Sequence, residues 1–262
     1  MNNLSYLAKL HPHKRDERIV FDEGPHIYYI DGSCHQYISC TTWNHSHFEH
    51  FNADLIISNM MKSVKWPQNK YYGKTSSEIK ALWDKNRDEA AEAGTKMHYD
   101  IECYYNQCPN NNDSVEYKYF LNFLKNYGHL TPYRTEWTVF HEDLKIAGSI
   151  DMVFENEDGT LLIYDWKRCK EIVKTNGFDK WGNKDCIEHL PDTNYWHYSL
   201  QLNTYKAILE EKYDKKVTEL YLVCLHPENK NNDYLRIKVP DLQEEVAQLF
   251  ELRRKELEKN TT

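Results

Sequence analysis

Two apolar runs separated by a short turn constrain the fold of this chain more than any other feature. Residues 146–155 and 161–167 are rich in aliphatic and aromatic side chains, and the five residues between them are Asn-Glu-Asp-Gly-Thr. An apolar run, a turn that contains glycine and a second apolar run are typical of a β-hairpin. If residues 156–160 form the loop, position 155 faces position 161, and Asp151 faces Asp165. The sequence therefore predicts an antiparallel hairpin with this register.

Three charged side chains lie at the open end of this hairpin. Side chains at i and i+2 of a strand, and at opposite positions of two paired strands, share a face of the sheet. Asp151, Asp165 and Lys167 are therefore expected to converge on one patch, which is costly to bury unless a cation joins the carboxylates. The Asp-x-Lys tripeptide alone would also fit an exposed ion pair of little energetic value. The preceding stretch 148–151 (GSID) and the hairpin register favour the cation site.

Length and composition set the class of protein. The 262 residues suit one large domain, or a domain with a small appendage, and 40% apolar residues are enough for a core. The chain lacks a long apolar run and a charged-then-apolar N-terminus, so we expect a soluble intracellular protein with no membrane partner. Seven scattered cysteines without a C-x-x-C fit reduced thiols. A net charge of −8 argues against coating nucleic acid by bulk electrostatics, but it leaves room for a locally basic groove.

The pattern of apolar residues predicts an α/β fold with a mixed central sheet flanked by helices. We expect an N-terminal β-meander over residues 19–42. Helices are expected over 48–65, 76–105, 114–127, 194–212 and 241–259, and strands over 134–141, 146–155, 161–167, 219–225 and 234–239. The chain is expected to divide into residues 1–75, a β-meander plus helix packed on the core, and residues 76–262, the core with its C-terminal helix.

A histidine and a glutamate one turn apart mark the helix expected over 76–105. His98 and Glu102 share a helical face, with Thr95 beside them. Taken alone, such a pair is more often part of a solvated helix face. If His98 completes a shell with Asp151 and Asp165, imidazole plus carboxylates suits Mn²⁺ and tolerates Mg²⁺.

The helix expected over 194–212 carries a second group of polar side chains. Gln201 and Tyr205 fall on one face, with Tyr198 one turn before them. Core packing is an adequate explanation for both tyrosines. Gln201 is harder to place in a core, because a buried amide needs hydrogen-bond partners, and it could orient Lys167 or a phosphate.

Four motifs in this order resemble the RecB-like branch of the PD-(D/E)XK nuclease superfamily. They are G-T-x-x-H-x-x-x-E (94–102), G-S-I-D (148–151), D-W-K (165–167) and Q-x-x-x-Y (201–205). The resemblance covers about residues 76–210; each motif alone is weak, whereas four in order are specific. Residues 37–42 (YISCTT) are similar to the entry segment of the mitochondrial genome maintenance exonucleases and of related phage and large-virus nucleases.

The resemblance implies a restriction-endonuclease-like core and a metal-dependent active site. His98, Asp151 and Asp165 would be metal ligands, joined by the backbone carbonyl of Trp166, and the cofactor would be Mg²⁺ or Mn²⁺. Lys167 would position or deprotonate the attacking water and stabilise charge in the transition state.

The remaining motif residues would act around this centre. Glu102 would support the ligands or hold a second metal ion, and Gln201 and Tyr205 would support Lys167 and the DNA backbone. Some RecB-like nucleases hold an iron–sulfur cluster with three closely spaced cysteines after the Q-x-x-x-Y helix. Only Cys224 follows that helix here, so no iron–sulfur cluster is expected. The sequence also lacks a helicase P-loop, so any unwinding must come from a partner.

Basic residues next to the D-W-K strand are candidates for nucleic-acid binding. Arg168, Lys170 and Lys174 follow it and could meet phosphates, although a solvated loop is an equal alternative. The resemblance adds Tyr205 to this set. Glu136 lies on the strand expected over 134–141, and strand alternation does not decide whether it faces the site.

Taken together, the sequence predicts a metal-dependent DNA nuclease, an exonuclease that acts on DNA ends or single strands. Its partners would be DNA and proteins of replication, repair or recombination, and a phage or large-virus origin would fit the resemblance. One alternative is a structure-selective or RNA-directed endonuclease on the same core. The other is a catalytically silent nucleic-acid-binding module. The set Asp151, Asp165, Lys167 and His98 argues against the silent module, because such a protein has no reason to keep buried like charges.

Overall fold

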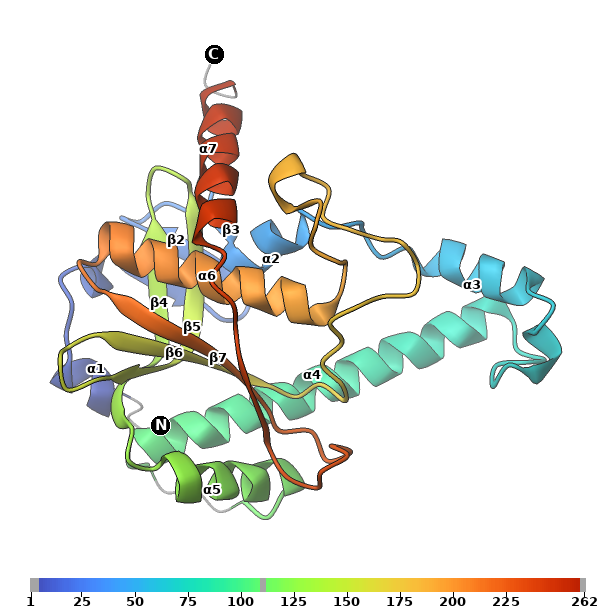
Figure 1. Ribbon diagram of the computed structural model, residues 1–262, viewed down its shortest axis with the longest axis horizontal. Helices are drawn as coiled ribbons and strands as arrows, with labels where there is room; N and C mark the ends of the chain where they lie inside the picture. The colour runs from blue at the N-terminus through green and yellow to red at the C-terminus, as the bar shows by residue number, and fades with distance from the viewer. Residues whose placement is uncertain (1–4, 109–111, 260–262) are drawn as a thin grey trace. The chain divides into compact units, whose positions relative to one another are not determined.

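The fold is a mixed α/β arrangement (Figure 1). The computed structural model describes residues 5–108 and 112–259. Its helices are α1 (Tyr6–Leu10), α2 (Cys40–His45), α3 (Ala53–Lys62), α4 (Ser76–Tyr105), α5 (Val115–Tyr127), α6 (Asn194–Lys212) and α7 (Gln243–Lys259). Its strands are β1 (Ile19–Asp22), β2 (Ile27–Ile30), β3 (Ile38–Ser39), β4 (Thr131–His141), β5 (Ile146–Glu155), β6 (Leu161–Lys167), β7 (Val217–Cys224) and β8 (Leu235–Lys238). Short 3-10 turns lie at Asp16–Arg18, Trp66–Gln68 and Asp185–Ile187.

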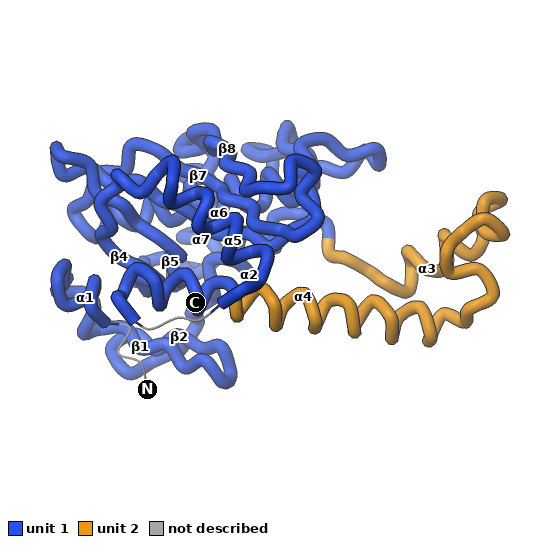
Figure 2. The backbone as a smooth tube through the Cα atoms, turned by 90° about the horizontal axis from the view of Figure 1, so that it is seen from below, with its two compact units in different colours: residues 1–49, 97–262 blue, residues 50–96 orange. Residues whose placement is uncertain are grey.

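The chain forms two compact units, coloured separately in Figure 2. The first comprises residues 1–49 and 97–262, and the second comprises residues 50–96. The sequence predicts a division at 75/76, at the start of α4. In the structure, the boundary falls within α4, between residues 96 and 97. Within the second unit, Lys80 pairs with Asp54 at 2.8 Å.

The first unit is built on a mixed sheet. Strands β4, β5, β6, β7 and β8 follow one another, with β6 and β7 parallel and the other pairs antiparallel. The short β3 joins the beginning of β5 in parallel, through Ile38–Ile146 and Ser39–Ala147. Strand β5 therefore has β4 along one edge, and β3 and then β6 along the other.

Helices cover both faces of this sheet, so its central strands are buried on both sides. In β6, Leu161 and Ile163 belong to the apolar cluster that includes α6 and α7 residues. Leu162, Tyr164 and Trp166 belong to the cluster that includes α5 and the end of α4. This alternation follows from the two-residue period of a strand. A near-continuous apolar run is therefore what β6 needs.

The hairpin predicted for residues 146–167 is confirmed. The ladder pairs Glu155 with Leu161, as expected, and Gly159 adopts the positive φ of 79° that its turn requires. The ladder ends at Met152–Tyr164, one pair short of the expected pairing of Asp151 with Asp165. The strands of the hairpin separate at that point, which leaves space for side chains between them.

The prediction of an N-terminal β-meander is wrong for its third strand. Strands β1 and β2 form a two-stranded antiparallel sheet of their own, as expected for the first two strands. Strand β3 pairs with β5 instead of β2. The turn chemistry of 31–33 predicts a reversal, but the pairing partner of a two-residue strand is decided by tertiary contacts that local sequence does not specify.

The predicted helices are confirmed: α4 and α6 have the expected ends, and α3, α5 and α7 begin later than expected. The helix expected over 48–65 is shorter, because Asn52 caps α3 by accepting a hydrogen bond from the backbone N–H of Leu55. Ser114 caps α5 in the same way through the N–H of Tyr117, and that helix ends before Gly128. Among the described residues, no helix is both long and apolar enough to cross a bilayer.

An ion pair fixes the N-terminal segment to the turn between β4 and β5. The Arg15 guanidinium donates to both carboxylate oxygens of Glu142, at 3.1 and 2.6 Å, and lies over the ring of Phe140. Burial by itself would raise the pKa of Glu142, but the hydrogen bonds from Arg15 outweigh it and lower the pKa to about 2. Ionised Glu142 therefore stabilises the folded state.

We expect Glu142→Gln to lower the free energy of unfolding at neutral pH by about 1–2 kcal/mol, because it leaves the buried guanidinium without its anion. A carboxyl group with a depressed pKa stabilises the fold above its unfolded pKa of about 4.3, and this contribution is lost as the pH falls towards about 2. Denaturant unfolding of both proteins between these pH values should show a smaller pH dependence for the variant. Asp143→Asn, which removes an exposed pair with Lys212, is the matched control. Equal losses in the two variants would contradict the assignment.

Candidate functional site

Three ligand-type side chains meet where β5 and β6 separate. His98 comes from α4, Glu136 from β4 and Asp151 from β5, and one ligand atom from each lies within 4.8 Å of the others. The Nδ1 atom of His98 is 3.5 Å from Glu136 Oε1 and 3.6 Å from Asp151 Oδ2. One imidazole nitrogen and two carboxylates are a donor set that suits Mn²⁺ and tolerates Mg²⁺. The residues present therefore fit a divalent cation, and these three side chains are called the metal group below.

The other nitrogen of His98 faces the backbone of β6. His98 Nε2 lies 2.9 Å from the carbonyl oxygen of Trp166. Nε2 donates its proton to this carbonyl, and a cation that displaces the proton of Nδ1 would meet the lone pair of that nitrogen. Such a hydrogen bond from the far nitrogen fixes the ring of a metal-binding histidine. The geometry thus gives the Trp166 carbonyl an orienting contact with His98, whereas the resemblance implies direct ligation.

Asp151 is held in place by the neighbouring strand. Its Oδ2 accepts a hydrogen bond of 2.9 Å from the backbone N–H of Trp166, in place of a regular strand partner. Regular alternation would put Ile150 and Met152 on one face, but they belong to different apolar clusters. Asp151 therefore sits at an irregularity in β5, which turns its carboxylate towards His98.

Glu136 is the residue of this group that sequence reasoning left undecided. Its backbone φ is +43°, an uncommon value for glutamate inside a strand. Its neighbours Thr135 and Trp137 pair with Met152 and Ile150, so Glu136 lies beside Asp151 on the adjacent strand. The hydroxyl of Ser149 donates to Glu136 Oε2 at 2.9 Å. Strand alternation could not find this orientation, because the positive φ breaks the alternation.

Asp165 and Lys167 form an ion pair on β6, close enough to Asp151 for the charges to interact. The Lys167 ammonium is 2.7 Å from Asp165 Oδ2, which confirms that these two side chains share a face. The ammonium also lies 4.7 Å from the centre of the Tyr198 ring. Asp165 is only 2% exposed and is not one of the three residues of the metal group. Its role as a ligand stays a prediction.

The pKa shifts show that these charges interact. Burial would lower the pKa of His98, but Asp151 and Glu136 outweigh it and raise the pKa to about 9. Burial raises the pKa of Asp151 and of Asp165, while Lys167 acts in the opposite direction on both. Burial makes the ionised form of these carboxylates unfavourable, and a bound divalent cation would stabilise that form.

Glu102 lies one turn after His98 on α4, as predicted. Burial raises its pKa to about 7, with Glu136 and Glu23 adding to the effect. It lies outside the three-residue metal group. Its predicted place near the ligands is therefore supported by electrostatics, and its role stays a prediction.

Gln201 and Tyr205, on α6, pack against α2 and β5. Gln201 donates to the hydroxyl oxygens of Thr41 and Tyr205, at 3.3 and 3.2 Å. A Cβ on Gly148 would come within 2.8 Å of the Tyr205 ring and 2.9 Å of the Cys40 Cβ, so the glycine is needed for this packing. Tyr205 is 3% exposed, and this burial is at odds with the expected direct contact to nucleic acid. The ring that lies against Lys167 is that of Tyr198, and the support of Lys167 by Gln201 stays a prediction.

The basic residues after β6 are engaged within the protein. Arg168 Nε donates to Glu116 at 2.7 Å, and Lys170 pairs with Glu228. Lys174 lies over the Tyr195 ring at 4.6 Å. Nucleic acid would have to compete with these partners, so their predicted contacts with phosphate stay predictions.

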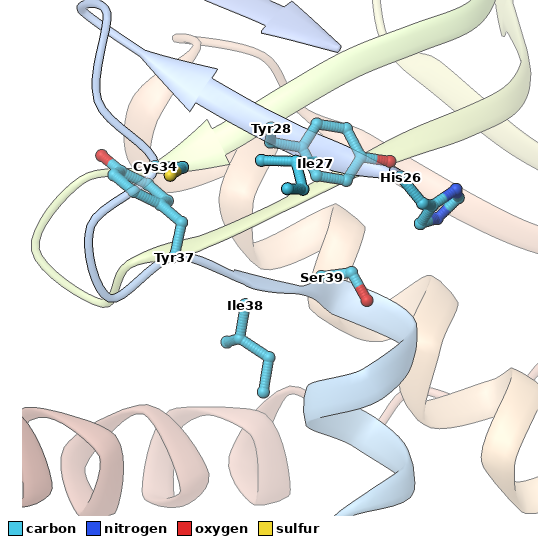
Figure 3. A pocket seen from close by; sticks show the side chains of 7 residues that line it. All are labelled: His26, Ile27, Tyr28, Cys34, Tyr37, Ile38 and Ser39. Atoms are coloured by element: carbon cyan, nitrogen blue, oxygen red, sulfur yellow. The ribbon is translucent and has the colours of Figure 1, made fainter. Parts of the chain in front are cut away.

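A cavity of about 190 Å³ opens between β2 and β3 (Figure 3). Its lining includes Tyr28, Tyr37 and Ser39. Burial raises the pKa of Tyr28, and the carboxylates of Glu136 and Asp151 add to the shift. Tyr28 thus lies within electrostatic reach of the metal group.

We expect Mn²⁺ to raise the Tm of the protein, because a ligand that binds only the folded state stabilises it by about 2.7 kcal/mol at one hundred times its Kd. Glu136→Gln keeps the shape but removes one charged ligand, so the Mn²⁺ concentration needed for the same shift should rise about 10–100-fold. A thermal titration with Mn²⁺ measures this. Glu157→Gln, in the exposed hairpin loop, is the matched control. An unchanged titration in Glu136→Gln would place the cation elsewhere.

Comparisons with known proteins leave the family open. No family model matches the chain, and no curated protein matches it. A comparison with solved structures finds the crystal structure of SSO0001, with a TM-score of 0.29 and 14% identity. The similarity covers 52% of this chain and 55% of that one, so this chain spans about half the length of that protein. A likeness this weak carries no inference about fold family or function.

Proposed function

We propose that this chain is a metal-dependent DNA nuclease of the RecB-like branch of the PD-(D/E)XK superfamily, an exonuclease acting on DNA ends or single strands. The proposal includes a restriction-endonuclease-like core. The observation that carries it is the meeting of His98, Glu136 and Asp151 beside the buried Asp165–Lys167 pair, at the point where β5 and β6 separate. The four motifs found in the sequence supply these residues, apart from Glu136.

The residues divide into a cation-binding group and a charged pair. His98, Glu136 and Asp151 would hold the cation, with the Trp166 carbonyl orienting His98. When bound, the cation supplies an activated nucleophile and neutralises charge that develops on the scissile phosphate. Asp165 is the predicted further ligand, placed next to this group by its position on β6.

Lys167 contributes charge at the same place. Its ion pair with Asp165 keeps the ammonium protonated and its position fixed, and the Tyr198 ring lies against it. A fixed cation beside the reacting phosphate stabilises negative charge in the transition state and can hold the attacking water by a hydrogen bond. This arrangement favours positioning and charge stabilisation over proton removal by Lys167.

Digestion of end-labelled oligonucleotides tests the proposal. The substrates are DNA and RNA, single- and double-stranded, labelled at the 5′ or the 3′ end, with Mn²⁺, Mg²⁺ or a chelator. We expect release of short products from DNA ends that requires Mn²⁺ or Mg²⁺. Internal cuts or a preference for RNA would favour the endonuclease alternative. Binding without cleavage under every condition would overturn the nuclease and leave the nucleic-acid-binding module.

A further inference from the structure

Two free cysteines touch each other at the end of the sheet, beyond the site described above. The sulfur atoms of Cys169 and Cys224 are 3.5 Å apart. The Cys224 thiol donates to the carbonyl oxygen of Cys169 at 2.8 Å. Fifty-five positions of sequence separate the two residues, so the fold and not local sequence brings them together.

One of the two cysteines belongs to the sheet and the other follows it. Cys224 ends β7 and pairs with Lys167, which ends β6. Cys169 lies two residues beyond Lys167, outside any regular strand, so its side chain is not fixed by a ladder. Disulfide sulfurs are about 2.0 Å apart, so the two atoms need to close by about 1.5 Å from their present contact.

A small reagent can reach this pair. Cys169 is partly exposed, and Cys224 lines a cavity of about 270 Å³ together with Lys170 and Asn229. Asn229 is also 3.7 Å from the Cys224 sulfur and donates to the Cys224 carbonyl at 3.1 Å, which holds this residue at the cavity wall. The hydrogen bond between the two thiols lowers the pKa of Cys224 and raises the pKa of Cys169, so the reactive thiolate is favoured at Cys224.

We propose that Cys169 and Cys224 form a reversible disulfide when the protein meets a hydroperoxide. One sulfur, as a thiolate, attacks an oxygen of the peroxide; the S–O bond forms as the O–O bond breaks, and the leaving oxygen takes a proton. The second sulfur then attacks the sulfenic acid; the S–S bond forms as the S–O bond breaks, and water leaves. Two thiols are oxidised and one hydroperoxide is reduced to water, or to water and an alcohol. The proposal does not depend on the proposed nuclease activity.

The disulfide would join the segment after β6 to the end of β7. It would fix the position of Arg168, which lies between Lys167 and Cys169. A thiol-based reductant reverses the bond by exchange. The pair is thus a redox-sensitive modification site next to the candidate active site, and its oxidation state would depend on the concentration of hydroperoxide.

Peptide mapping of the full native chain tests this inference. The protein is treated with hydrogen peroxide, its remaining thiols are alkylated, and it is digested without reductant. We expect one peptide pair linked through Cys169 and Cys224, in which neither of these two thiols is alkylated, and recovery of both after dithiothreitol. Cys34→Ser removes an exposed thiol elsewhere and should give the same linked pair.

Variants and an internal standard make the result decisive. Cys169→Ser and Cys224→Ser should each lose the linked peptide, and the wild-type result stands by itself if either variant fails to fold. Cys34 in the wild-type protein reports that the oxidant acted. Oxidation of Cys34 without any Cys169–Cys224 peptide would overturn the proposal. So would a dominant link between Cys103 and Cys108, which are also close in the chain.

Discussion

Replacing Lys167 with methionine is expected to reduce metal-dependent cleavage by about 10²–10⁴-fold, the range typical of a single acid–base or charge-stabilising group. Methionine keeps the unbranched side chain up to the position of Cε but has no ammonium to place beside the phosphate. The Mn²⁺-dependent rise in Tm should remain, because the metal group of His98, Glu136 and Asp151 does not include Lys167. Single-turnover cleavage rates and thermal titrations on the same preparations measure the two effects separately.

The control for this variant is Lys238→Met. Lys238 pairs with Glu219 on neighbouring strands of the same sheet, but its side chain is 61% exposed and it belongs to no part of the proposed site. The Lys238→Met variant should cleave at the wild-type rate. If Lys167→Met cleaves within tenfold of the wild type while remaining folded, Lys167 has no catalytic role and the active-site assignment fails.

Asp151→Asn is expected to remove both metal binding and cleavage. The amide can still accept the hydrogen bond from Trp166 N–H, so the strand geometry is retained. It lacks the charge that a divalent cation needs, and we expect the cleavage rate to fall by at least about 10³-fold, as for loss of a strong electrostatic contact in an active site. Isothermal titration with Mn²⁺ should show no binding at concentrations that saturate the wild type.

Without metal, the stability of the same variant should change little, because burial and the neighbouring carboxylates oppose the charge of Asp151 while His98 and Lys167 favour it. Asp158→Asn, in the exposed hairpin loop, is the matched control and should bind Mn²⁺ as the wild type does. Wild-type Mn²⁺ affinity in Asp151→Asn would move the cation site away from β5.

The hairpin at the centre of the fold could be predicted because several local signals agree. Residues 161–167 are apolar at nearly every position, which is what a strand buried on both faces needs, and the loop carries Gly159 where a positive φ is required. The register then places Asp165 and Lys167 on one face without further information. The helix that carries His98 was predictable for the same reason, from a long run of helix-forming residues.

The parts that could not be predicted depend on contacts between distant segments. Glu136 faces the site only because its backbone leaves the regular strand conformation, and no pattern in its neighbours signals this. The partner of β3 is β5, more than a hundred residues later in the chain, whereas local turns favour a meander. The contact between Cys169 and Cys224 is likewise invisible in the sequence. In each case tertiary packing decides what local preference leaves open.

One titration tests the central claim, that the cation held by His98, Glu136 and Asp151 carries out phosphodiester cleavage. Wild-type protein is titrated with Mn²⁺, and in the same samples the bound fraction and the single-turnover cleavage rate of a labelled single-stranded DNA are both measured. The account predicts that occupancy and rate rise together with one half-saturation point, and that a chelator abolishes both. Cleavage that persists in the chelator, or Mn²⁺ binding that saturates with no cleavage of any nucleic acid, would contradict it.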